Sequence, residues 1–327
     1  MKKIIIFLTV IILSSCATKN QSTKNIKSSH KIDLEEIFNR KFQQMFISRG
    51  DNFPDFSVRK DYRNLFLVAL HNEIPIKDFK SRVQFSNSKM DSIINILETK
   101  SWLHKIDGKY KPTVFVATKE DGNQLYEYAK PISRQIAKEI KKELPTIKKE
   151  FQKTEISKKQ NFEEWSFLIL SDVLLDNWQI FNVENQFLGK FARPIRHGKN
   201  YYASIEEITT DRESFGIYGN QYGKISVYGN NREKADLSRT EYFVSNNDNQ
   251  IFKSIAENFL PKLVKVLNEN KEYAKNTYTK SGYSKEITFE EFFMWWYHFI
   301  YTQATDDMAE MKILTIPKSG NFVYEIE

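Results

Sequence analysis

Cysteine is almost absent from this chain: Cys16 is the only one among 327 residues. One cysteine cannot form a disulfide within the chain, and it cannot supply the several thiolates of a structural zinc site. Long apolar runs are also missing near the N-terminus, where the run from Ile4 to Leu13 has ten residues. A membrane-spanning helix needs about twenty apolar residues, so this run is too short to be a permanent span.

Motifs for metals and nucleotides are absent as well. The five histidines are scattered and no HExxH occurs, so the sequence does not support zinc chemistry. Gly216, Gly219 and Gly223 lack the GxGxxG spacing of a dinucleotide site, and they fall in a predicted hairpin. His298 stands among large aromatic residues without a second ligand nearby, which favours a hydrogen-bonded core histidine. We therefore expect no metal and no cofactor.

Acidic residues are absent from residues 1 to 30, which contain five lysines. The net charge of +7 would ordinarily favour a nucleic-acid partner, but without these lysines residues 31 to 327 carry only +2. The positive charge therefore belongs to the N-terminal tail rather than to the folded part. Residues 17 to 30 are polar and basic, as expected for a flexible tether whose lysines lie near anionic lipid headgroups.

The first sixteen residues have the three regions of a secretory signal. Two lysines follow Met1, an apolar run comes next, and two serines precede the cysteine. The segment Leu13-Ser14-Ser15-Cys16 resembles the lipobox of bacterial lipoprotein precursors, which has an aliphatic residue, two small residues and cysteine. The alternative is an ordinary cleaved signal that happens to end at a cysteine.

The resemblance implies that the Cys16 thiol accepts a diacylglycerol and that cleavage leaves Cys16 at the start of the mature chain. Residues 1–15 are then a signal peptide and residues 16–30 a polar lipid tether. Two or more acyl chains, such as palmitate, hold a protein on a membrane far longer than one. A lipidated Cys16 also leaves no thiol for a catalytic nucleophile. The residue after Cys16 is not Asp. In the lipoproteins that this segment resembles, the absence of Asp at this position favours sorting to the outer membrane. We therefore expect a location in the cell envelope, on the outer membrane facing the periplasm.

Residues 31 to 120 predict a small helical unit that ends in a hairpin. Apolar residues at three- and four-residue spacings predict amphipathic helices. These are expected over residues 33–47, 62–72, 76–83 and 88–100, the last with Ser88 as its N-cap. Asp107-Gly108 then predicts a tight hairpin turn, because both central positions of a type I′ turn need positive φ.

Three short helices and a hairpin give residues 56–118 a layout similar to a winged helix, which implies either DNA binding or a scaffold for protein contacts. The helix that would enter a DNA groove has Lys89 and Lys100 against Asp91 and Glu98. Such a neutral face gains little from phosphate neutralisation. Export also separates the protein from the chromosome, so we expect a scaffold and no nucleic-acid partner.

Residues 121 to 327 predict helices packed with a small antiparallel sheet, so the fold class is helix-rich α+β. Helices are expected over residues 122–153, 165–181 and 249–275 and after Thr288, with kinks at Pro145 and Pro261. Capping boxes precede two of them, at Asn161-Phe162-Glu163-Glu164 and Thr288-Phe289-Glu290-Glu291. Strands are expected over residues 200–208 and 214–230 and in a C-terminal hairpin around 319–321. Residues 288–327 are a candidate second winged unit.

Asp172 and Asp176 are the first candidates for catalysis. They lie four residues apart on the predicted helix 165–181, so they share one face with apolar residues. Two carboxylates in apolar surroundings can separate their pKa values and act as acid and base. The alternative is structural: both side chains reach a wet rim or pair with lysines.

A basic loop is the second candidate site. Residues 190–199, KFARPIRHGK, lie in a stretch without acid between Glu184 and Glu206. Arginine binds carboxylate or phosphate through paired hydrogen bonds, and nearby tyrosines add a stacking surface for a sugar or a peptide. The candidate anion or ligand surface consists of Arg193, Arg196, His197, Lys199, Tyr218 and Tyr222. The alternative is a solvated loop beside a tyrosine-rich sheet.

These features favour a lipid-anchored cell-envelope protein with a non-catalytic role in binding or assembly. Its expected partners are the membrane, through lipidated Cys16, and an envelope protein or an anionic envelope polymer. The first alternative is an envelope hydrolase or transferase that uses Asp172 and Asp176. The second, which requires the signal peptide to be misread, is a nucleic-acid-binding regulator. An enzyme predicts a cleft into which both aspartates project, whereas a binding protein predicts a shallow basic or aromatic surface around residues 190–228.

Overall fold

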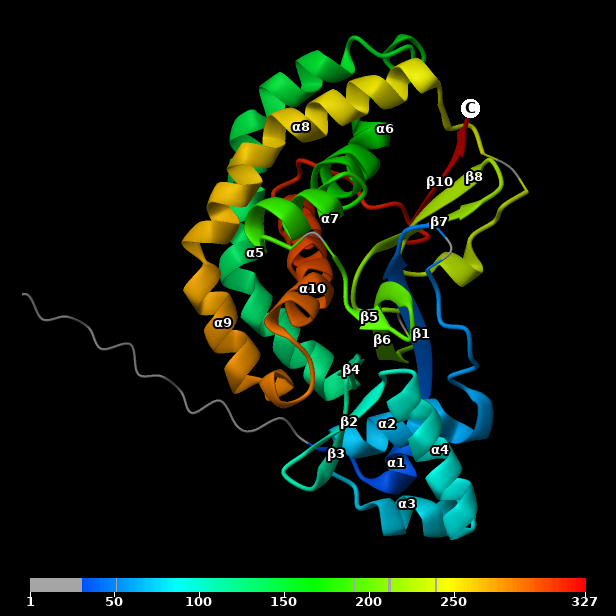
Figure 1. Cartoon of the computed structure of the whole chain (residues 1–327). Coiled ribbons are helices and arrows are strands. Elements are labelled where there is room, and N and C mark those ends of the chain that lie inside the picture. The colour runs from blue at the N-terminus through cyan, green and yellow to red at the C-terminus, as the bar shows by residue number, and fades with distance from the viewer. Residues whose placement is uncertain (1–30, 51, 191, 211–212, 239) are drawn as a thin grey trace, which may run out of the picture.

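The computed structural model describes residues 31–327 except 51, 191, 211–212 and 239. The predicted signal peptide, the lipobox with Cys16 and the polar tether lie outside the described residues. The described chain is helix-rich α+β, as predicted: long helices form a curved wall beside two small sheets, and a smaller helical unit lies at one end (Figure 1). Within this part of the chain, no helix is both long and apolar enough to cross a membrane.

The first predicted helix, 33–47, is wrong beyond Asn39. Helix α1 (Leu34–Asn39) starts at a capping box but ends after six residues, where Arg40 becomes extended. Strand β1 (Lys41–Ser48) follows and pairs antiparallel along its whole length with β6 (Lys199–Ile208). Pairing with this distant strand overrides the helical spacing of the local apolar residues, because tertiary context outweighs propensity.

The three short helices and the hairpin of the N-terminal unit are present, as predicted. They are α2 (Arg63–His71), α3 (Ile76–Val83), α4 (Asn87–Thr99), β2 (Leu103–Ile106) and β3 (Lys109–Pro112), and a 3-10 turn, η1 (Lys60–Tyr62), precedes α2. Asp107 and Gly108 both have positive φ, as the predicted turn requires. The N-cap of α4 is Ser86 rather than Ser88, and its hydroxyl accepts from the Lys89 amide.

The first sheet lies between two hydrophobic cores. Its strand order is β1–β6–β4, with β4 (Phe115–Ala117) parallel to β6 and β5 (Ile195–Arg196) paired with the start of β6. Because side chains alternate along a strand, Tyr201 and Ile205 of β6 pack into the core of the N-terminal unit, whereas Tyr202 packs into the core of the helices. The N-terminal core therefore includes a strand from beyond residue 120.

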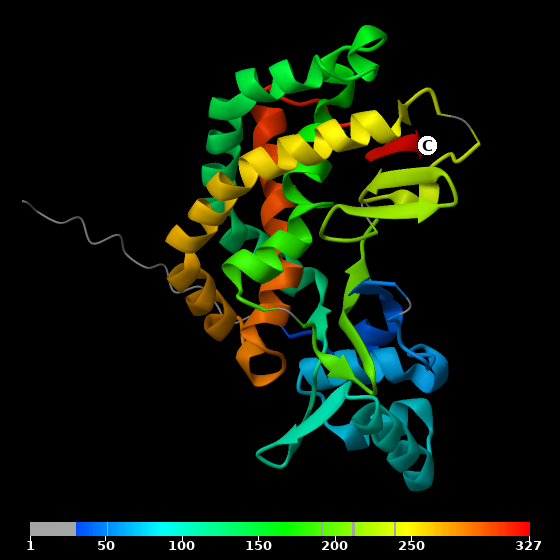
Figure 2. The same ribbon diagram turned by 45° about the horizontal axis from the view of Figure 1, so that its top comes forward.

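Long helices build the larger core (Figures 1 and 2). They are α5 (Lys119–Phe151), α8 (Asn246–Glu269), α9 (Lys271–Lys280) and α10 (Phe289–Glu310), with the 3-10 turns η2 (Ile156–Lys158) and η6 (Tyr283–Lys285). Helix α10 packs along α5 and is buried through most of its length, as its aromatic sequence predicts. Helices α5 and α8 both continue through their internal prolines, and the predicted helix 249–275 is divided at Asn270 instead.

The strands predicted between residues 200 and 230 divide between two sheets. The second sheet has the order β7–β8–β10–β9. Its strands are β7 (Tyr218–Tyr222), β8 (Ile225–Gly229), β9 (Phe243–Val244) and β10 (Asn321–Ile326), and the turn η5 (Arg232–Lys234) follows β8. The predicted C-terminal hairpin is wrong, since in the described chain β10 pairs with β8 and β9 rather than with the segment that precedes it. The C-terminus lies beside this sheet (Figure 1).

Candidate functional site

A short π-helix positions the two candidate aspartates. The predicted capping box at Asn161 starts α6 (Phe162–Phe167), and the chain then widens into the π-helix η3 (Leu168–Val173). Such helices are rare and occur frequently at functional sites. Asp172 lies in η3, and its carbonyl oxygen accepts from the amide of Asp176 at 2.9 Å.

The predicted helix 165–181 ends early. Beyond Leu175 the chain turns and continues as α7 (Gln179–Asn182) and a second π-helix, η4 (Val183–Phe187). Phe181, at the end of the predicted helix, is 44% exposed. Asp176 therefore lies at the end of the buried helix rather than in its middle.

Asp172 and Asp176 line the same cavity, which has a volume of about 310 Å³. Their side chains are buried, with residue exposures of 5% and 8%. The rest of the wall consists of Asn177, Gly219, Asn220, Gln221, Ser226, Val227, Tyr324 and Ile326. The aspartates thus meet amides and hydroxyls from the second sheet in a space that falls at the lower end of the size range of ligand pockets.

The environment of the pair disfavours two negative charges. Burial, together with the nearby charge of Asp176, raises the pKa of Asp172 well above its ordinary value. Burial also raises the pKa of Asp176 to about 7, although a hydrogen bond with Tyr301 and the charge of Arg232 act in the opposite direction. Near neutral pH the pair therefore holds a proton that ordinary aspartates would have lost.

Tyrosine hydroxyls surround the two carboxyl groups. The hydroxyl of Tyr324 lies beside the carboxyl of Asp172, and that of Tyr301 lies beside Asp176 and donates to the Ile217 carbonyl. Burial and the neighbouring carboxylates raise the pKa of Tyr228 and Tyr301 well above the ordinary range, so both hydroxyls keep their protons. The site therefore combines two carboxyl groups with neutral hydroxyl groups that can exchange hydrogen bonds with them.

The basic loop does not form an open anion-binding surface. Arg196 is 3% exposed, and its Nη2 donates to both carboxylate oxygens of Glu291, at 2.7 and 2.8 Å. Arg193 donates from Nε and Nη2 to the two carboxylate oxygens of Glu184, at 2.7 and 3.1 Å. Both guanidinium groups are therefore used within the fold.

The second predicted capping box is half formed because of this ion pair. The hydroxyl of Thr288 accepts from the amide of Glu291 at 3.3 Å, as predicted for the N-cap of α10. The side chain of Glu291, however, extends to Arg196 of β5. The same glutamate thus starts a helix and joins it to the first sheet.

Of the other members of the predicted surface, Tyr218 and Tyr222 of β7 line one cavity, which His197 and Lys199 do not line. Tyr218 is buried and its ring stacks on His298, with centroids 4.5 Å apart. His298 is a core histidine, as predicted, and burial lowers its pKa to about 3. Tyr222 is 47% exposed, and the side chain of His197, in the turn between β5 and β6, is 46% exposed. Lys199 is the first residue of β6.

A second cavity of about 300 Å³ lies next to the first and was not predicted. The two cavities share Gly219 and Asn220 of β7. Arg232 stands in its wall and donates to Glu213 from Nε at 2.5 Å and to Asn220 from Nη1 at 3.2 Å. Arg232 lies in the loop after β8, where no motif in the sequence marks it as a site residue.

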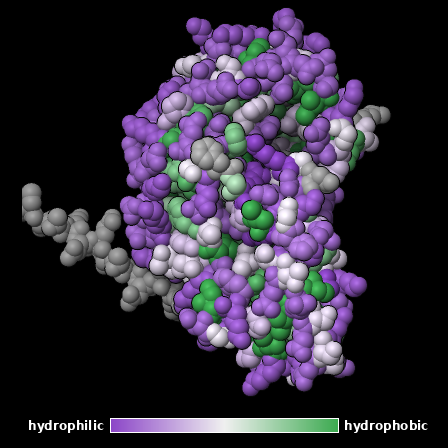
Figure 3. Space-filling model, in the orientation of Figure 1, coloured by the Kyte–Doolittle hydropathy of each residue, from purple (hydrophilic) through white to green (hydrophobic). Residues whose placement is uncertain are grey.

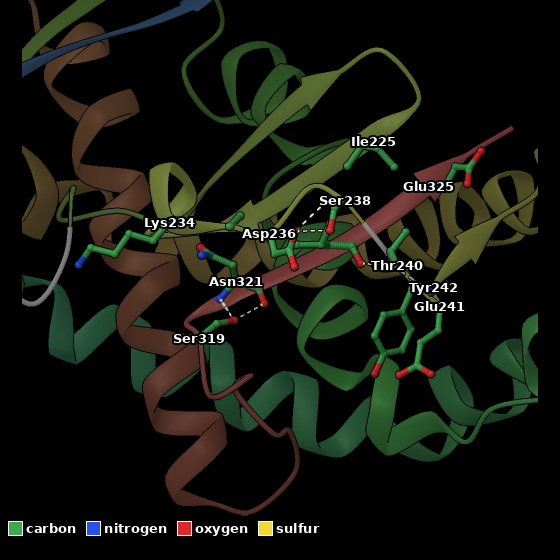
Figure 4. A pocket seen from close by; sticks show the side chains of 12 residues that line it. Ile225, Lys234, Asp236, Ser238, Thr240, Glu241, Tyr242, Ser319, Asn321 and Glu325 are labelled. Atoms are coloured by element: carbon green, nitrogen blue, oxygen red, sulfur yellow. Dashed lines mark hydrogen bonds between the residues drawn. The ribbon is translucent and has the colours of Figure 1, made fainter.

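A wider hollow of about 880 Å³ over β8 and β10 is a weaker candidate (Figure 4). Its polar groups already bond to one another: the Ser238 hydroxyl donates to Asp236 at 2.7 Å, and Thr240 donates to the Val323 carbonyl at 2.7 Å. On the face shown in Figure 3, hydrophilic side chains predominate and hydrophobic ones form small separate groups. We therefore place the candidate site at the aspartate pair.

Comparisons of the chain with protein-family models, with curated proteins and with solved structures found no match. In the described residues, no group of three or more His, Cys, Asp or Glu side chains is arranged to hold a metal ion. The function is therefore argued from the site itself.

Proposed function

We propose that the protein is a lipid-anchored component of a bacterial cell envelope, and that the cavity of Asp172 and Asp176 is an acid–base site for hydrolysis of, or transfer to, an envelope polymer. One observation carries the proposed chemistry: two buried carboxyl groups stand on the wall of one cavity, and burial raises the pKa of both. The anchor rests on the lipobox that ends at Cys16.

The proton held by the pair gives the two carboxyl groups different roles. The ionised carboxylate takes a proton from a water or acceptor hydroxyl, whose oxygen forms the new bond to the polymer. The protonated carboxyl gives its proton to the leaving atom as the old bond breaks. The pair ends with one proton, now on the other carboxyl, so a second proton exchange with water restores the starting state.

Asp172→Asn and Asp176→Asn test this chemistry. Each should lower turnover about a hundredfold or more, because an amide neither accepts nor gives the required proton. The full chain is incubated with envelope polymer purified from the producing bacterium, and new reducing ends and new amino groups are measured. Asp91→Asn, exposed on α4, is the control and should leave the rate unchanged. Cleavage at the wild-type rate by both site variants would contradict the proposal.

A non-catalytic binding role is the second candidate, and the amide and hydroxyl lining of the cavity favours it. In that case the wild-type chain binds the polymer without cleaving it. The aspartate variants then elute earlier from the immobilised polymer than Asp91→Asn does. The same preparations therefore separate the two candidate functions.

The anchor is tested by metabolic labelling. Labelled palmitate should enter the wild-type protein and be absent from Cys16→Ser, because the thiol is the only cysteine sulfur in the chain. The Ser variant should also leave the membrane fraction. Equal labelling of the two proteins would contradict the anchor.

A further inference from the structure

The second cavity lies where the edge strand of each sheet faces the other. Strand β1 runs towards the β7–β8 hairpin (Figure 1). The cavity is lined by Gln43, Gln44, Met45, Phe46 and Phe53 from the N-terminal unit and by Glu213, Tyr218, Gly219, Asn220, Tyr222, Arg232, Glu233 and Trp295 from the larger body. Phe46 and Phe53 meet edge to face there, with ring centroids 6.2 Å apart.

Three hydrogen-bond donors of this wall have no partner in the described part of the chain, and one of them is the buried hydroxyl of Tyr218. The indole Nε1 of Trp295 is buried and unpaired, and the whole Trp295 side chain is inaccessible to solvent. The amide Nε2 of Gln44 is likewise buried and unpaired. A buried donor without a partner has lost its hydrogen bond to water, so a ligand that offers acceptors to these groups gains from satisfying them.

The charges of the cavity favour a neutral ligand. Arg232 is already paired with Glu213, and Glu233 adds another negative charge, so the lining is slightly negative. An anion is therefore disfavoured. A cation is disfavoured for another reason: the three unpaired groups all carry protons to donate, and a cation offers no acceptor.

We propose that this cavity is a saccharide subsite, in which the apolar face of a pyranose lies against the exposed ring of Phe53 and its oxygen atoms accept from Trp295 and Gln44 once the side chains of the wall move to expose these donors. Aromatic side chains provide apolar surface with defined geometry, and the donors fix the orientation of the sugar. The role of the subsite rests on the proposed function: the cavity shares Gly219 and Asn220 with the cavity of the aspartate pair, so a saccharide bound here lies next to the acid–base site.

The subsite is tested by titration of the full chain, held in a sugar-free detergent, with tri-N-acetylchitotriose and with cellotriose. The indole N–H signal of Trp295, identified by its loss in Trp295→Phe, should shift in nitrogen–proton correlation spectra. Phe53→Ala should weaken binding about fivefold or more. Phe53 is 48% exposed, so this variant should still fold. Phe243→Ala, at 46% exposure on the opposite edge of the second sheet, is the matched control and should bind as the wild type does.

Three results would overturn the subsite: no shift of the Trp295 signal with either sugar at millimolar concentration, equal weakening by both Phe variants, or a shift with tetraglycine and none with the sugars. The titration does not depend on turnover. Saccharide binding by a chain whose aspartate variants cleave as well as the wild type supports the subsite and contradicts the acid–base site. Cleavage that is lost in the aspartate variants, without saccharide binding, supports the acid–base site and contradicts the subsite.

Discussion

Asp176 holds a carboxyl group where its negative charge is unfavourable. Burial raises its pKa to about 7 in the folded chain, whereas an aspartate in an unfolded chain titrates near about 3.9. Between these two values the unfolded chain has lost the proton that the folded chain keeps, so stability decreases as the pH rises from about 4 to about 7. A purely structural residue would gain nothing from this arrangement, whereas an acid–base group needs it.

Asp176→Asn should therefore stabilise the protein while it removes turnover. The expected gain is roughly 1–3 kcal/mol at pH 8, and it should shrink towards zero near pH 4, where the carboxyl is protonated in both states. Thermal unfolding of wild type, Asp176→Asn and the control Asp91→Asn at both pH values measures it. A variant less stable than wild type at pH 8 would show that the carboxylate is a structural partner instead.

Sequence spacing was sufficient to select the aspartate pair and insufficient to interpret the arginines. Asp172 and Asp176 are neighbours because they lie four residues apart on one helix, which is local geometry. Arg196 loses its expected role because its carboxylate partner, Glu291, comes from a helix 95 positions away. Nothing in the local sequence of residues 190–199 indicates that such a partner exists. The loop has the charged composition of a surface segment, but Arg196 within it is buried.

Among the helices, turns and strands too, features determined by neighbouring residues were predicted and features determined by distant contacts were not. Helix caps and the turn at Asp107-Gly108 were predicted because neighbouring residues determine them. Strand β1 was predicted as helix because its apolar residues have helical spacing, and only its pairing with β6 makes it a strand. The π-helix η3 was predicted as part of one regular helix over residues 165–181.

The attachment of β10 to β8 depends on a glycine. A Cβ at Gly229 would overlap the carbonyl oxygen of Gly320 and the side chain of Asn321, whereas a Cβ at Gly219 of β7 would have its nearest neighbour at 4.0 Å. Gly229→Ala should therefore cost roughly 1–3 kcal/mol, and Gly219→Ala should be nearly neutral. Urea denaturation of the two variants measures the difference, and equal midpoints would contradict the close approach of the strands. Because β10 carries Tyr324 into the aspartate cavity, Gly229→Ala should also lower turnover.

At the scale of the whole molecule, a charged cluster joins the N-terminal unit to the helical body. His71, at the end of α2, lies between Asp121 of α5 and Glu286 after η6, and its ring nitrogens are 3.3 and 2.7 Å from their carboxylate oxygens. Lys111 of β3 lies 3.8 Å from Glu286, and the ring of Tyr283 lies 5.5 Å from that of His71. The sequence did not predict this cluster, because its members are brought together only when the two cores meet.

The cluster makes the stability of the whole molecule depend on pH above neutrality. Burial alone would lower the pKa of His71, but the charges of Glu286 and Asp121 raise it to about 10. The unfolded histidine titrates near about 6.5, so the stabilisation is complete below that pH and is lost as the pH rises towards 10. This direction is opposite to that of acid denaturation, in which paired carboxylates lose their charge.

His71→Gln should reduce this pH dependence. Between about pH 7.5 and 9.5 the unfolding free energy of the wild type should fall by roughly 2 kcal/mol more than that of the variant. Urea denaturation at several pH values in this range measures both. The comparison of the two slopes isolates the histidine, because the aspartate pair and the buried tyrosines are the same in both proteins. His197→Gln, with a half-exposed histidine, is the control and should keep the wild-type slope. If His71→Gln keeps that slope too, the pair of carboxylates does not hold a charged histidine, and the two cores are joined by packing alone.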